Sequence, residues 1–395
     1  MPKLLQINIV SNMLSTGKIC EDIAKVAKDF GWDTYIAYGR WARPGVNKSK
    51  RIGNNIDMYM HYFQHRVFDR EGLSSVAATK GLLNWIEEIK PDIIQLHNIH
   101  DHYINYPILF NFLDTLDIPI IWTQHDCWAY TGGCMYHDLY HCNQWRNGCL
   151  GICPNKRALL CDFSGKQFKK KQIVFSNVKK LIIVTVSYWL NDLFKQTYHS
   201  NRKSYVIHNG IDLEIFRPLP LRKDKYFSIL GVAAVWDERK GLSDFVKLRK
   251  LLPENFKIIL IGLTKKQIKC MPDGINAITR TSNIEELVRL YSDADVFVNP
   301  TYSDNFPTTN LEALACGTPV ITYRTGGSHE AVDENTGAVV EQGDLIALCA
   351  KITEFYTQGF KKIHSEDCRN RAEQLFDKDK CFHKYIHLYE SLLNI

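Results

Sequence analysis

The chain has 395 residues, of which 45% are hydrophobic, 23% charged and 12% aromatic. This composition excludes a mainly disordered chain, and the length predicts two domains of ordinary size. No apolar run reaches the ~20 residues that span a bilayer, and the apolar N-terminus is too short for a signal-peptide core. We therefore expect a cytoplasmic protein.

The formal net charge of +6 is unevenly distributed. Residues 1–218 hold 26 Lys and Arg against 19 Asp and Glu, whereas residues 219–395 hold 23 against 24. A basic cluster contains Lys166, Lys169, Lys170, Lys171, Lys179 and Lys180. Such a cluster is either an ordinary solvated helix face or a contact for anionic lipid at the inner face of the membrane. The excess is small and lacks interleaved aromatic residues, so we expect no nucleic-acid partner.

Short apolar runs alternate with helical patterns along the first half of the chain. Strands are expected at 4–10, 34–38, 92–97, 118–123, 181–187 and 205–207, with helices at 19–30 and 79–89. A second series of strands is expected at 226–232, 257–262, 275–280, 295–299 and 319–323, after a polar linker at 217–224. This alternation predicts two doubly wound, parallel-sheet α/β domains facing across a cleft. Ligands bind such sheets at the carboxyl ends of the strands.

Six of the twelve cysteines lie between Cys127 and Cys161, in a stretch rich in Trp, Tyr and Gly that fits neither series. We interpret residues 127–171 as an insert in the first domain. Within it, Cys134, Cys142, Cys149 and Cys153 have the chemistry of a four-thiolate zinc site, although tighter cysteine pairs are usual there. Disulfides and unlinked buried thiols stay open as alternatives.

The segment from Asn299 to Ile321 carries the clearest chemistry. Its pattern predicts a strand end, a loop containing Asp304 and Phe306, and a short helix with Pro307 in its first turn. The free N–H groups of Thr308 and Thr309 then form an anion site, because a helix N-terminus attracts negative charge. Glu312 follows, just over one turn inside the helix.

This segment resembles the E-x7-E region of the retaining nucleotide-sugar glycosyltransferases of family 4, which have the GT-B fold. The likeness covers Phe306, Glu312-Ala313 and the run from Gly317 to Ile321. It implies that Glu312 holds the donor's ribose. Asp304 occupies the first acidic position, where the family more often has Glu, and is implied to contact the transferred sugar.

A second stretch, from Gly231 to Gly241, is similar to the family's diphosphate-binding loop. Lys240 matches the family's Lys, whereas Ala234 or Val235 stands where the family has Arg, so that role is vacant or passes to Arg239. Fixed cations near the diphosphate would stabilise the leaving group. The resemblance also implies a base contact at Thr279 and Arg280.

The resemblance extends through the first half of the chain. It includes Gly17 in the turn after the first strand, which we expect to lie close to a phosphate or sugar. It also includes the 97–100, 125–134 and 209–212 stretches, which are similar to the colanic-acid and capsular-polysaccharide branch of the family. By this likeness His125 contacts the donor sugar, and Asp126 could orient it.

The resemblance therefore implies a retaining hexosyltransferase of cell-surface polysaccharide biosynthesis. Its donor is a nucleoside diphosphate sugar and its acceptor a glycan or lipid-linked glycan. We expect residues 1–218 to bind the acceptor, residues 219–376 to bind the donor, and a helix at 377–395 to pack on the first domain. The acidic pair Asp293 and Asp295 leads directly into a strand, so we expect metal-independent catalysis without a cofactor. Alternatives are an epimerase or phosphorylase of the same fold, or a non-catalytic binding protein that uses the cysteine-rich insert.

Overall fold

The computed structural model describes residues 1–150, 152–155, 158–222 and 225–394. The predicted insert, linker and C-terminal helix each include positions outside the described residues, namely Gly151, Lys156, Arg157, Lys223, Asp224 and Ile395. The chain divides into two compact units. Unit 1 comprises residues 1–208 and 382–395, and unit 2 comprises residues 209–381. Where the sequence predicts a boundary after Pro218, this division falls after His208.

Unit 1 is built on a seven-stranded parallel sheet with the strand order β3-β2-β1-β4-β5-β6-β7. Its strands are β1 Lys3–Asn8, β2 Asp33–Tyr38, β3 Lys48–Arg51, β4 Ile93–Leu96, β5 Ile120–Gln124, β6 Leu181–Thr185 and β7 Ser204–Val206. The central strands β4, β5 and β6 are buried along their whole length. Strands that are covered on both faces are mainly apolar, which explains the Ile, Leu and Val in these strands.

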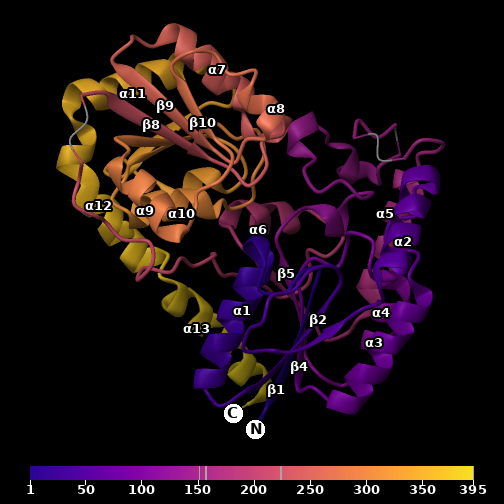
Figure 1. The fold of residues 1–395 in the computed structure, drawn as a ribbon. Coiled ribbons are helices and arrows are strands. Elements are labelled where there is room, and N and C mark those ends of the chain that lie inside the picture. Colours follow the sequence, from indigo (N-terminus) through magenta and orange to yellow (C-terminus); the bar gives the residue numbers. More distant parts are fainter. Residues whose placement is uncertain (151, 156–157, 223–224, 395) are drawn as a thin grey trace. The chain divides into compact units, whose positions relative to one another are not determined.

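Helices cover both faces of this sheet. They are α1 Leu14–Asp29, α2 Asn55–Phe68, α3 Val76–Ile89, α4 Tyr106–Leu113, α5 Ser164–Asn177 and α6 Tyr188–Phe194. Figure 1 shows α1 on one side of the sheet and α3, α4 and α5 on the other. Helix α13, Lys378–Leu393, reaches the α1 side, where its Tyr389 hydroxyl donates to Gln95 of β4 and its Tyr385 hydroxyl accepts from Thr123 of β5.

The insert between β5 and α5 has little regular structure. Its described residues form only three short 3₁₀ turns, η1 Trp128–Tyr130, η2 Asp138–Tyr140 and η3 Gln144–Asn147. Glycines bring it close to the start of α5, because a Cβ on Gly132 would lie 2.6 Å from the Ser164 carbonyl oxygen. Lys171 of α5 is fully buried and donates to the carbonyls of Trp128 and Thr131. Lys171 therefore anchors the insert and does not belong to an exposed basic face, contrary to the prediction.

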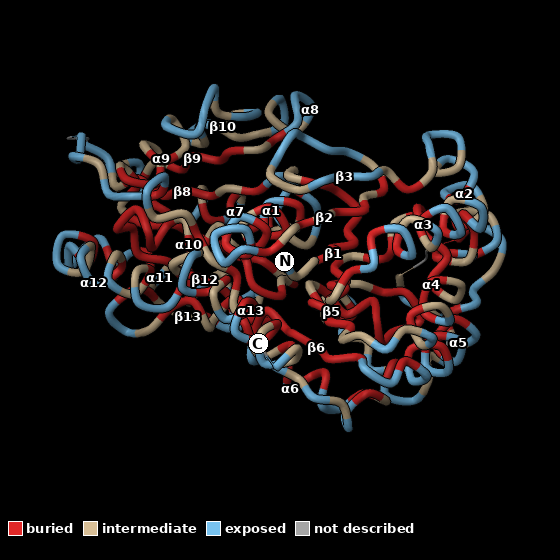
Figure 2. Tube along the Cα trace, turned by 90° about the horizontal axis from the view of Figure 1, so that it is seen from below, coloured by how far each residue is buried: buried red, intermediate tan, exposed pale blue. Residues whose placement is uncertain are grey.

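Unit 2 is built on a six-stranded parallel sheet with the order β10-β9-β8-β11-β12-β13. Its strands are β8 Phe227–Val232, β9 Phe256–Ile261, β10 Ile275–Ile278, β11 Val296–Asn299, β12 Val320–Tyr323 and β13 Gly337–Val340. Its helices are α7 Leu242–Leu251, α8 Lys265–Ile268, α9 Ile284–Asp293, α10 Thr308–Ala315, α11 Leu345–Gln358 and α12 Phe360–Leu375, with 3₁₀ turns η4 Glu238–Lys240 and η5 Ser328–Ala331. Alternate side chains of β8 and β11 face a core shared with α7 and α11, to which Ile229, Phe245, Val298 and Ile352 belong. In Figure 2 the central strands of both sheets are buried, whereas β3 and the outer turns of α2 and α12 are exposed.

The predicted α/β class with two parallel sheets is confirmed. All eleven predicted strands are present, and two were missed. Strand β3 consists of Lys, Ser and Arg at a sheet edge, where no apolar pattern is required. Strand β13 forms the other sheet's edge, and its Gly337 approaches β12 so closely that a Cβ would lie 2.0 Å from the Val320 carbonyl oxygen. The first helix also begins earlier than predicted, at Leu14.

Candidate active site

Two loops meet at the carboxyl edge of the unit 2 sheet. The loop after β8 ends in the turn η4, which carries Arg239 and Lys240, and the loop after β11 carries Asp304. The Tyr302 N–H donates to the Arg239 carbonyl at 2.7 Å. Gly241 makes this approach possible, because its φ is +69° and a Cβ there would lie 2.1 Å from the Pro300 carbonyl oxygen. Only glycine combines that backbone angle with that contact.

The two cations converge on one carboxylate. The Lys240 ammonium forms an ion pair with Asp304 Oδ2, and Arg239 Nη1 lies 3.6 Å from the same oxygen. Arg239 also donates to the Ser303 carbonyl at 2.9 Å. All three charged side chains are only about one-sixth exposed, at 16–17%. Arg239, Lys240 and Asp304 thus place two positive charges and one negative charge in a site partly screened from water. The half-exposed Asp237 carboxylate lies 3.8 Å from Arg239 Nε. A diphosphate is the type of anion that two fixed cations can bind.

Asp304 is fixed by its backbone as well. Gly326, with φ of +50°, lies so close that a Cβ would be 1.8 Å from the Asp304 carbonyl oxygen. The Thr325-Gly326-Gly327 turn therefore packs under the loop and shapes the site. Because both loops are held by glycine contacts, their charged side chains project from a defined scaffold.

The short helix α10 begins directly after this loop. Pro307 takes the cap position and Thr308 the first helical position, so the proline lies one residue earlier than predicted. Thr308 and Thr309 are half-buried, and helix geometry leaves their N–H groups without partners inside the helix. The Phe306 ring is buried 5.8 Å from that of Phe376. Phe306 therefore contributes packing here.

Glu312 lies on α10, where its Oε2 accepts a hydrogen bond of 2.8 Å from the Tyr291 hydroxyl. Tyr291 is fully buried on α9, and burial together with the nearby Glu312 charge raises its pKa well above the ordinary value. Tyr291 therefore stays protonated and donates to the glutamate. No sequence pattern indicated this partner, because Tyr291 lies on the buried face of the amphipathic helix α9, where it resembles any core residue.

A buried polar network supports α10 from below. The Asn299 amide donates to Asn310 Oδ1 at 2.8 Å, and Asn310 donates to Ser328. The Thr322 and Ser328 hydroxyls are 2.6 Å apart. Such networks fix a unique arrangement when every member is satisfied. This network holds α10 against β11 and β12. None of its residues was predicted as part of the site.

Thr279 and Arg280 follow β10, two strands away from β8, and both are exposed. The end of β10 is hydrogen-bonded to the residue after β9, because the Gly262 N–H donates to the Ile278 carbonyl at 2.9 Å. The two residues therefore share the carboxyl edge with the charged cluster without belonging to it.

In unit 1, Gly17 lies inside the first turn of α1 and is buried. A Cβ there would lie 3.0 Å from the Val10 side chain and 3.2 Å from the Asn12 nitrogen. The structure thus places Gly17 against the loop after β1, where it lets that loop pack on the helix.

His97 and His125 follow β4 and β5. Their rings stack, and His97 Nδ1 lies 3.0 Å from His125 Nε2. His97 Nε2 is paired with Gln6 Oε1 at 3.1 Å. Burial lowers the pKa of His125 to about 4 and holds that of His97 well below its usual value. Both rings are therefore neutral near pH 7.

Asp126 does not orient His125, contrary to the prediction. Its Oδ2 pairs with His100 Nε2 at 2.8 Å, and its Oδ1 accepts from the Trp128 N–H at 2.8 Å. Burial lowers the pKa of His100, but the Asp126 and Asp101 carboxylates outweigh it and hold the pKa well above its usual value.

Glu71, His100 and Asp101 each offer one possible metal-ligand atom, and these three atoms lie within 4.8 Å of one another. A proton on His100 offsets one of the negative charges of Asp101 and Asp126.

All twelve cysteines lie in the described part of the chain, and each is a free thiol. The structure therefore contains no disulfide, one of the alternatives left open. Cys134, Cys142, Cys149 and Cys153 line one small cavity within the insert.

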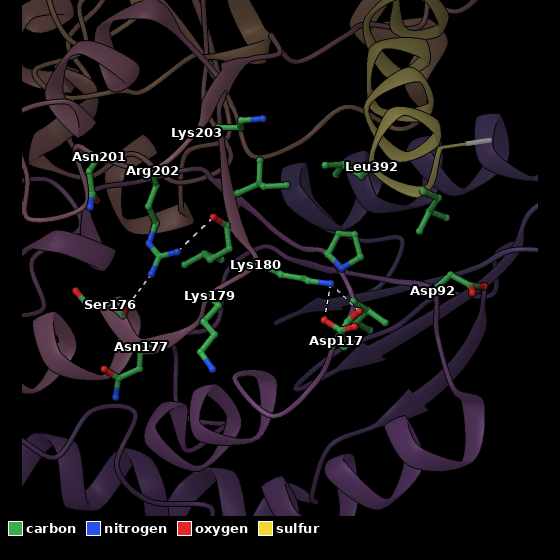
Figure 3. Close-up of a pocket in the computed structure, with 15 residues that line it drawn as sticks. Asp92, Asp117, Ser176, Asn177, Lys179, Lys180, Asn201, Arg202, Lys203 and Leu392 are labelled. Carbon is green, nitrogen blue, oxygen red and sulfur yellow. Dashed lines mark hydrogen bonds and ion pairs between the residues drawn. The ribbon is translucent and has the colours of Figure 1, made fainter.

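A cleft of about 700 Å³ lies at the opposite, amino-terminal edge of the unit 1 sheet (Figure 3). Lys179, Lys180, Arg202 and Lys203 line it. Lys180 is paired with Asp117 at 2.6 Å, and Arg202 donates to backbone carbonyls, among them that of Ser176. Since ligands of doubly wound sheets bind at the carboxyl edge, we do not include this cleft in the candidate active site.

Comparison with known proteins decides the family. The profile described as "Glycosyltransferase Family 4" matches residues 18–215, which is half of the chain, and "Glycosyl transferases group 1" matches residues 214–375. The chain belongs to glycosyltransferase family 4. The predicted resemblance is thereby confirmed.

Two curated relatives of this glycosyltransferase come from polysaccharide pathways. The putative colanic acid biosynthesis glycosyl transferase WcaC of Escherichia coli is 22% identical over 316 residues, covering 76% of this chain and 77% of WcaC. The capsular polysaccharide biosynthesis glycosyltransferase CapM of Staphylococcus aureus is 26% identical over 204 residues, covering 47% of this chain and 53% of CapM.

Solved structures share the fold over the whole glycosyltransferase. Sucrose-phosphate synthase from Thermosynechococcus elongatus matches with a TM-score of 0.74 at 15% identity, covering 100% of both chains. Anabaena HepE in complex with UDP matches with a TM-score of 0.68 at 14% identity, covering 99% and 100%. The two parallel-sheet units thus form a GT-B glycosyltransferase, as predicted. None of the helices in the described ranges combines the length and apolar character that crossing a bilayer requires.

Proposed function

We propose that this glycosyltransferase moves a hexosyl group, with retention, from a nucleoside diphosphate sugar to a glycan or lipid-linked glycan of a cell-surface polysaccharide. The observation that carries the proposal is the convergence of Arg239, Lys240 and Asp304 at one sheet edge, directly before the helix that bears Glu312. The relatives named for colanic acid and capsule biosynthesis support the pathway. The UDP complex of HepE supports a uridine donor.

Donor binding would exchange one ion pair for another. Lys240 and Arg239 contact Asp304, and the donor's diphosphate would compete with that carboxylate for the two cations. The Thr308 and Thr309 N–H groups at the start of α10 add two further donors for a phosphate. Arg239 thereby fills the role for which the family's usual arginine position holds Ala234 or Val235. Glu312, held by Tyr291, accepts from the ribose hydroxyls.

The chemistry follows from the charge that develops as the glycosidic bond breaks. The departing diphosphate gains negative charge, which Lys240, Arg239 and the α10 N-terminus stabilise before the reaction begins. These fixed groups supply the electrostatic stabilisation that other enzymes obtain from a metal ion, so we propose metal-independent transfer. Asp304, released from Lys240, contacts the sugar, and the acceptor attacks from the face that the leaving group vacates. This front-side path retains the configuration of the anomeric carbon.

Unit 1 would supply the acceptor side. His125 is neutral at pH 7 because burial lowers its pKa to about 4, so its ring can exchange hydrogen bonds with a sugar hydroxyl.

In unit 2, Thr279 and Arg280 are proposed to contact the base, since they are exposed at the carboxyl edge of this donor-binding unit.

The donor assignment is tested by thermal shift with UDP-, GDP- and ADP-sugars on the wild type, Glu312→Ala and Glu334→Ala. Glu334 is an exposed glutamate of the same unit and serves as the matched control. We expect one nucleotide class to stabilise the wild type and Glu334→Ala but not Glu312→Ala. Equal shifts in both variants would refute the site. Conversion of the donor sugar without an acceptor would instead indicate an epimerase.

A membrane-facing surface on unit 1 supports a lipid-linked acceptor. Helix α2 exposes an apolar stripe at helical spacing, in which Ile56 is 76% exposed and Tyr59, Met60 and Phe63 are more than half exposed. The start of α5 lies beside the end of α2, because the Gln167 amide donates to the Asp69 carbonyl at 3.0 Å. Helix α5 exposes Lys166, Lys169 and Lys170. Apolar side chains next to lysines are typical of helices that lie on anionic membranes.

Flotation with phosphatidylglycerol and phosphatidylcholine vesicles tests this surface. We expect the wild type to float with the anionic vesicles only, and a triple charge reversal of Lys166, Lys169 and Lys170 to abolish flotation. Reversal of three exposed lysines of unit 2, Lys265, Lys266 and Lys269, is the matched control and should have no effect. Equal flotation of both triple variants would contradict the assignment.

A further inference from the structure

The cleft at the amino-terminal edge of the unit 1 sheet lies apart from the residues assigned to sugar transfer. Its volume of about 700 Å³ falls within the ~300–1,000 Å³ range of pockets that bind small molecules. Strands β5 and β6 have five residues each, so about 16 Å of sheet separates this edge from the carboxyl edge, at about 3.3 Å per residue. A molecule bound in the cleft would therefore be too far from His97 and His125 to take part in transfer.

The sheet itself holds the walls of this cleft in place. The residues that line it include Asp92 before β4, Pro119 before β5, Lys180 before β6 and Lys203 before β7. These four strands are consecutive neighbours in the sheet. Leu392, near the end of α13, lines the cleft as well (Figure 3). Hydrogen-bonded strands thus fix the relative positions of the side chains in the cleft.

Four cations and two carboxylates line the cleft, so its lining has a net charge of +2. Both carboxylates already have partners. The Lys180 ammonium lies 2.6 Å from Asp117 Oδ1 and donates to the Asp117 carbonyl at 3.0 Å. The Asp92 carboxylate accepts a hydrogen bond of 2.7 Å from the Lys3 backbone N–H. Lys180 is therefore the one cation of the lining that these contacts neutralise.

The other three cations have no carboxylate within hydrogen-bonding distance in the described part of the chain. Arg202 donates to the carbonyls of Phe175 and Ser176 at 3.3 and 2.7 Å, at the end of α5, so its charge is fixed in place. Lys179 and Lys203 are exposed, and in Figure 3 no dashed line reaches either side chain. A cleft lined by charges of one sign concentrates ions of the opposite sign. The cleft is thus suited to an anion.

Neutral polar side chains lie among these cations. Ser176 and Asn177 end α5, Asn201 lies in the loop before β7, and all three are exposed. Hydroxyl and amide groups both donate and accept hydrogen bonds, as sugar hydroxyls do. Pro119 and Leu392 add an apolar wall, against which the C–H face of a sugar ring can pack. The lining therefore offers each kind of contact that an acidic sugar uses.

We propose that this cleft binds an anionic saccharide, namely a short glycan that bears carboxylate or phosphate groups. Lys179 and Lys203 would pair with the acidic groups, in the charge-assisted contacts that ammonium groups make with such anions. Asn177 and Asn201 would hydrogen-bond the sugar hydroxyls. A neutral glycan would leave the two lysines without partners, so the site should prefer acidic glycans. A bilayer surface is flat, whereas these cations line a recess, which favours a ligand that can enter it.

Calorimetric titration of the full chain, without nucleotide sugar, tests the proposal. The acidic probes are tetragalacturonate and trehalose 6-phosphate, and the neutral probe is maltotetraose. We expect at least one acidic probe to bind with a Kd about tenfold or more below that of maltotetraose. Because the contacts are ionic and partly exposed, this binding should weaken as NaCl is raised from about 0.05 to about 0.5 M.

A double substitution locates the binding. Lys179→Ala with Lys203→Ala should raise the Kd for the acidic probe about tenfold or more. The matched control is Lys28→Ala with Lys80→Ala, which removes two exposed lysines of unit 1 that lie outside the cleft and should leave the Kd unchanged. Every residue of the cleft belongs to unit 1, so Glu312→Ala should bind the acidic probe like the wild type. A failed donor assignment therefore leaves this result unchanged.

Three results would overturn the acidic-saccharide site. The first is that neither acidic probe binds more tightly than maltotetraose. The second is that inorganic phosphate alone binds as tightly as both acidic probes, which would make the cleft a simple anion site. The third is that the Lys179 and Lys203 double variant keeps its affinity for the acidic probe but no longer floats with phosphatidylglycerol vesicles. That outcome would assign the two lysines to a membrane contact.

Discussion

The carboxyl edges of the two sheets carry different chemistry on the same architecture. In unit 2 the edge holds charged side chains, with Lys240 and Arg239 around Asp304. In unit 1 it holds two neutral imidazoles, since burial lowers the pKa of both His97 and His125, beside a buried His100–Asp126 ion pair. Two cations around one carboxylate suit an anionic diphosphate, and neutral imidazoles suit the hydroxyl groups of a sugar. The parallel sheet only sets where the loops end, and the side chains decide what each edge can bind.

The largest effect that separates the two units should be acid sensitivity. Burial lowers the pKa of six unit 1 histidines. The pKa is about 3 for His61 and His199, about 4 for His102 and His125, and below the ordinary value for His97 and His137. Because the folded pKa lies below the ordinary 6.5, each ring contributes stability above that pH and loses it as the pH falls toward 4. We expect a loss on the order of 1 kcal/mol per ring by pH 5.

Hydrogen exchange at pH 7 and pH 5, corrected for intrinsic rates, resolves the two units. The protection of β4, β5 and β6 should fall at pH 5, whereas that of β8, β11 and β12 should hold. His100 works against the trend, because its raised pKa adds stability at low pH, but it is one ring against six. Equal loss of protection in both sheets would contradict the contrast.

Removal of one unit 2 cation should have the next largest effect. Lys240→Met keeps the side-chain length and removes the charge, and we expect kcat/KM for the nucleotide sugar to fall by about 10²–10³, as when one electrostatic donor is deleted elsewhere. Lys250→Met, an exposed lysine of the same unit, is the control and should leave kcat/KM unchanged. An unaltered kcat/KM in Lys240→Met would exclude this lysine from the site.

Asp304→Asn should separate binding from transfer. The substitution removes the carboxylate that competes with the diphosphate for Lys240, so UDP should bind more tightly, by up to about tenfold for 1.4 kcal/mol. Transfer should fall in the same variant, because Asp304 is proposed to contact the sugar. Calorimetric titration with UDP and an assay of transfer measure the two effects. Weaker UDP binding would show that Asp304 only positions Lys240.

Most of the fold could be predicted because the central parallel strands are mainly apolar. The strands around Ile94 and Ile259 carry that signal, whereas β3, with Lys48 and Arg51, does not need it at a sheet edge. Helix starts were harder to predict, because Asn12 before α1 and Leu14 at its first position have φ of 50° and 54°, values that no local pattern indicates.

The candidate site was predictable only in part. Lys240, Asp304 and Glu312 were predicted as individual residues, but their partners come from segments distant in sequence. Asp304 meets Lys240 across 64 residues, and Tyr291 reaches Glu312 from another helix. The error at Asp126 has the same cause, because its partner His100 follows a different strand. Periodicity and motif spacing describe one segment at a time and cannot show such pairs.

The smallest expected effect concerns the support of Glu312. Tyr291→Phe removes the hydroxyl that donates to the Glu312 carboxylate and keeps the ring that packs 5.5 Å from Phe297. Such a hydrogen bond to a charged group contributes about 1.5 kcal/mol, so the Kd for UDP should rise about tenfold at most. Tyr323→Phe is the matched control, because its buried hydroxyl donates to Asp244 in the same unit. Both variants should lose similar stability in thermal unfolding, and only Tyr291→Phe should weaken UDP binding. If Tyr323→Phe weakens it equally, the loss reflects the general stability of unit 2, and the carboxylate on α10 does not depend on Tyr291 for its position.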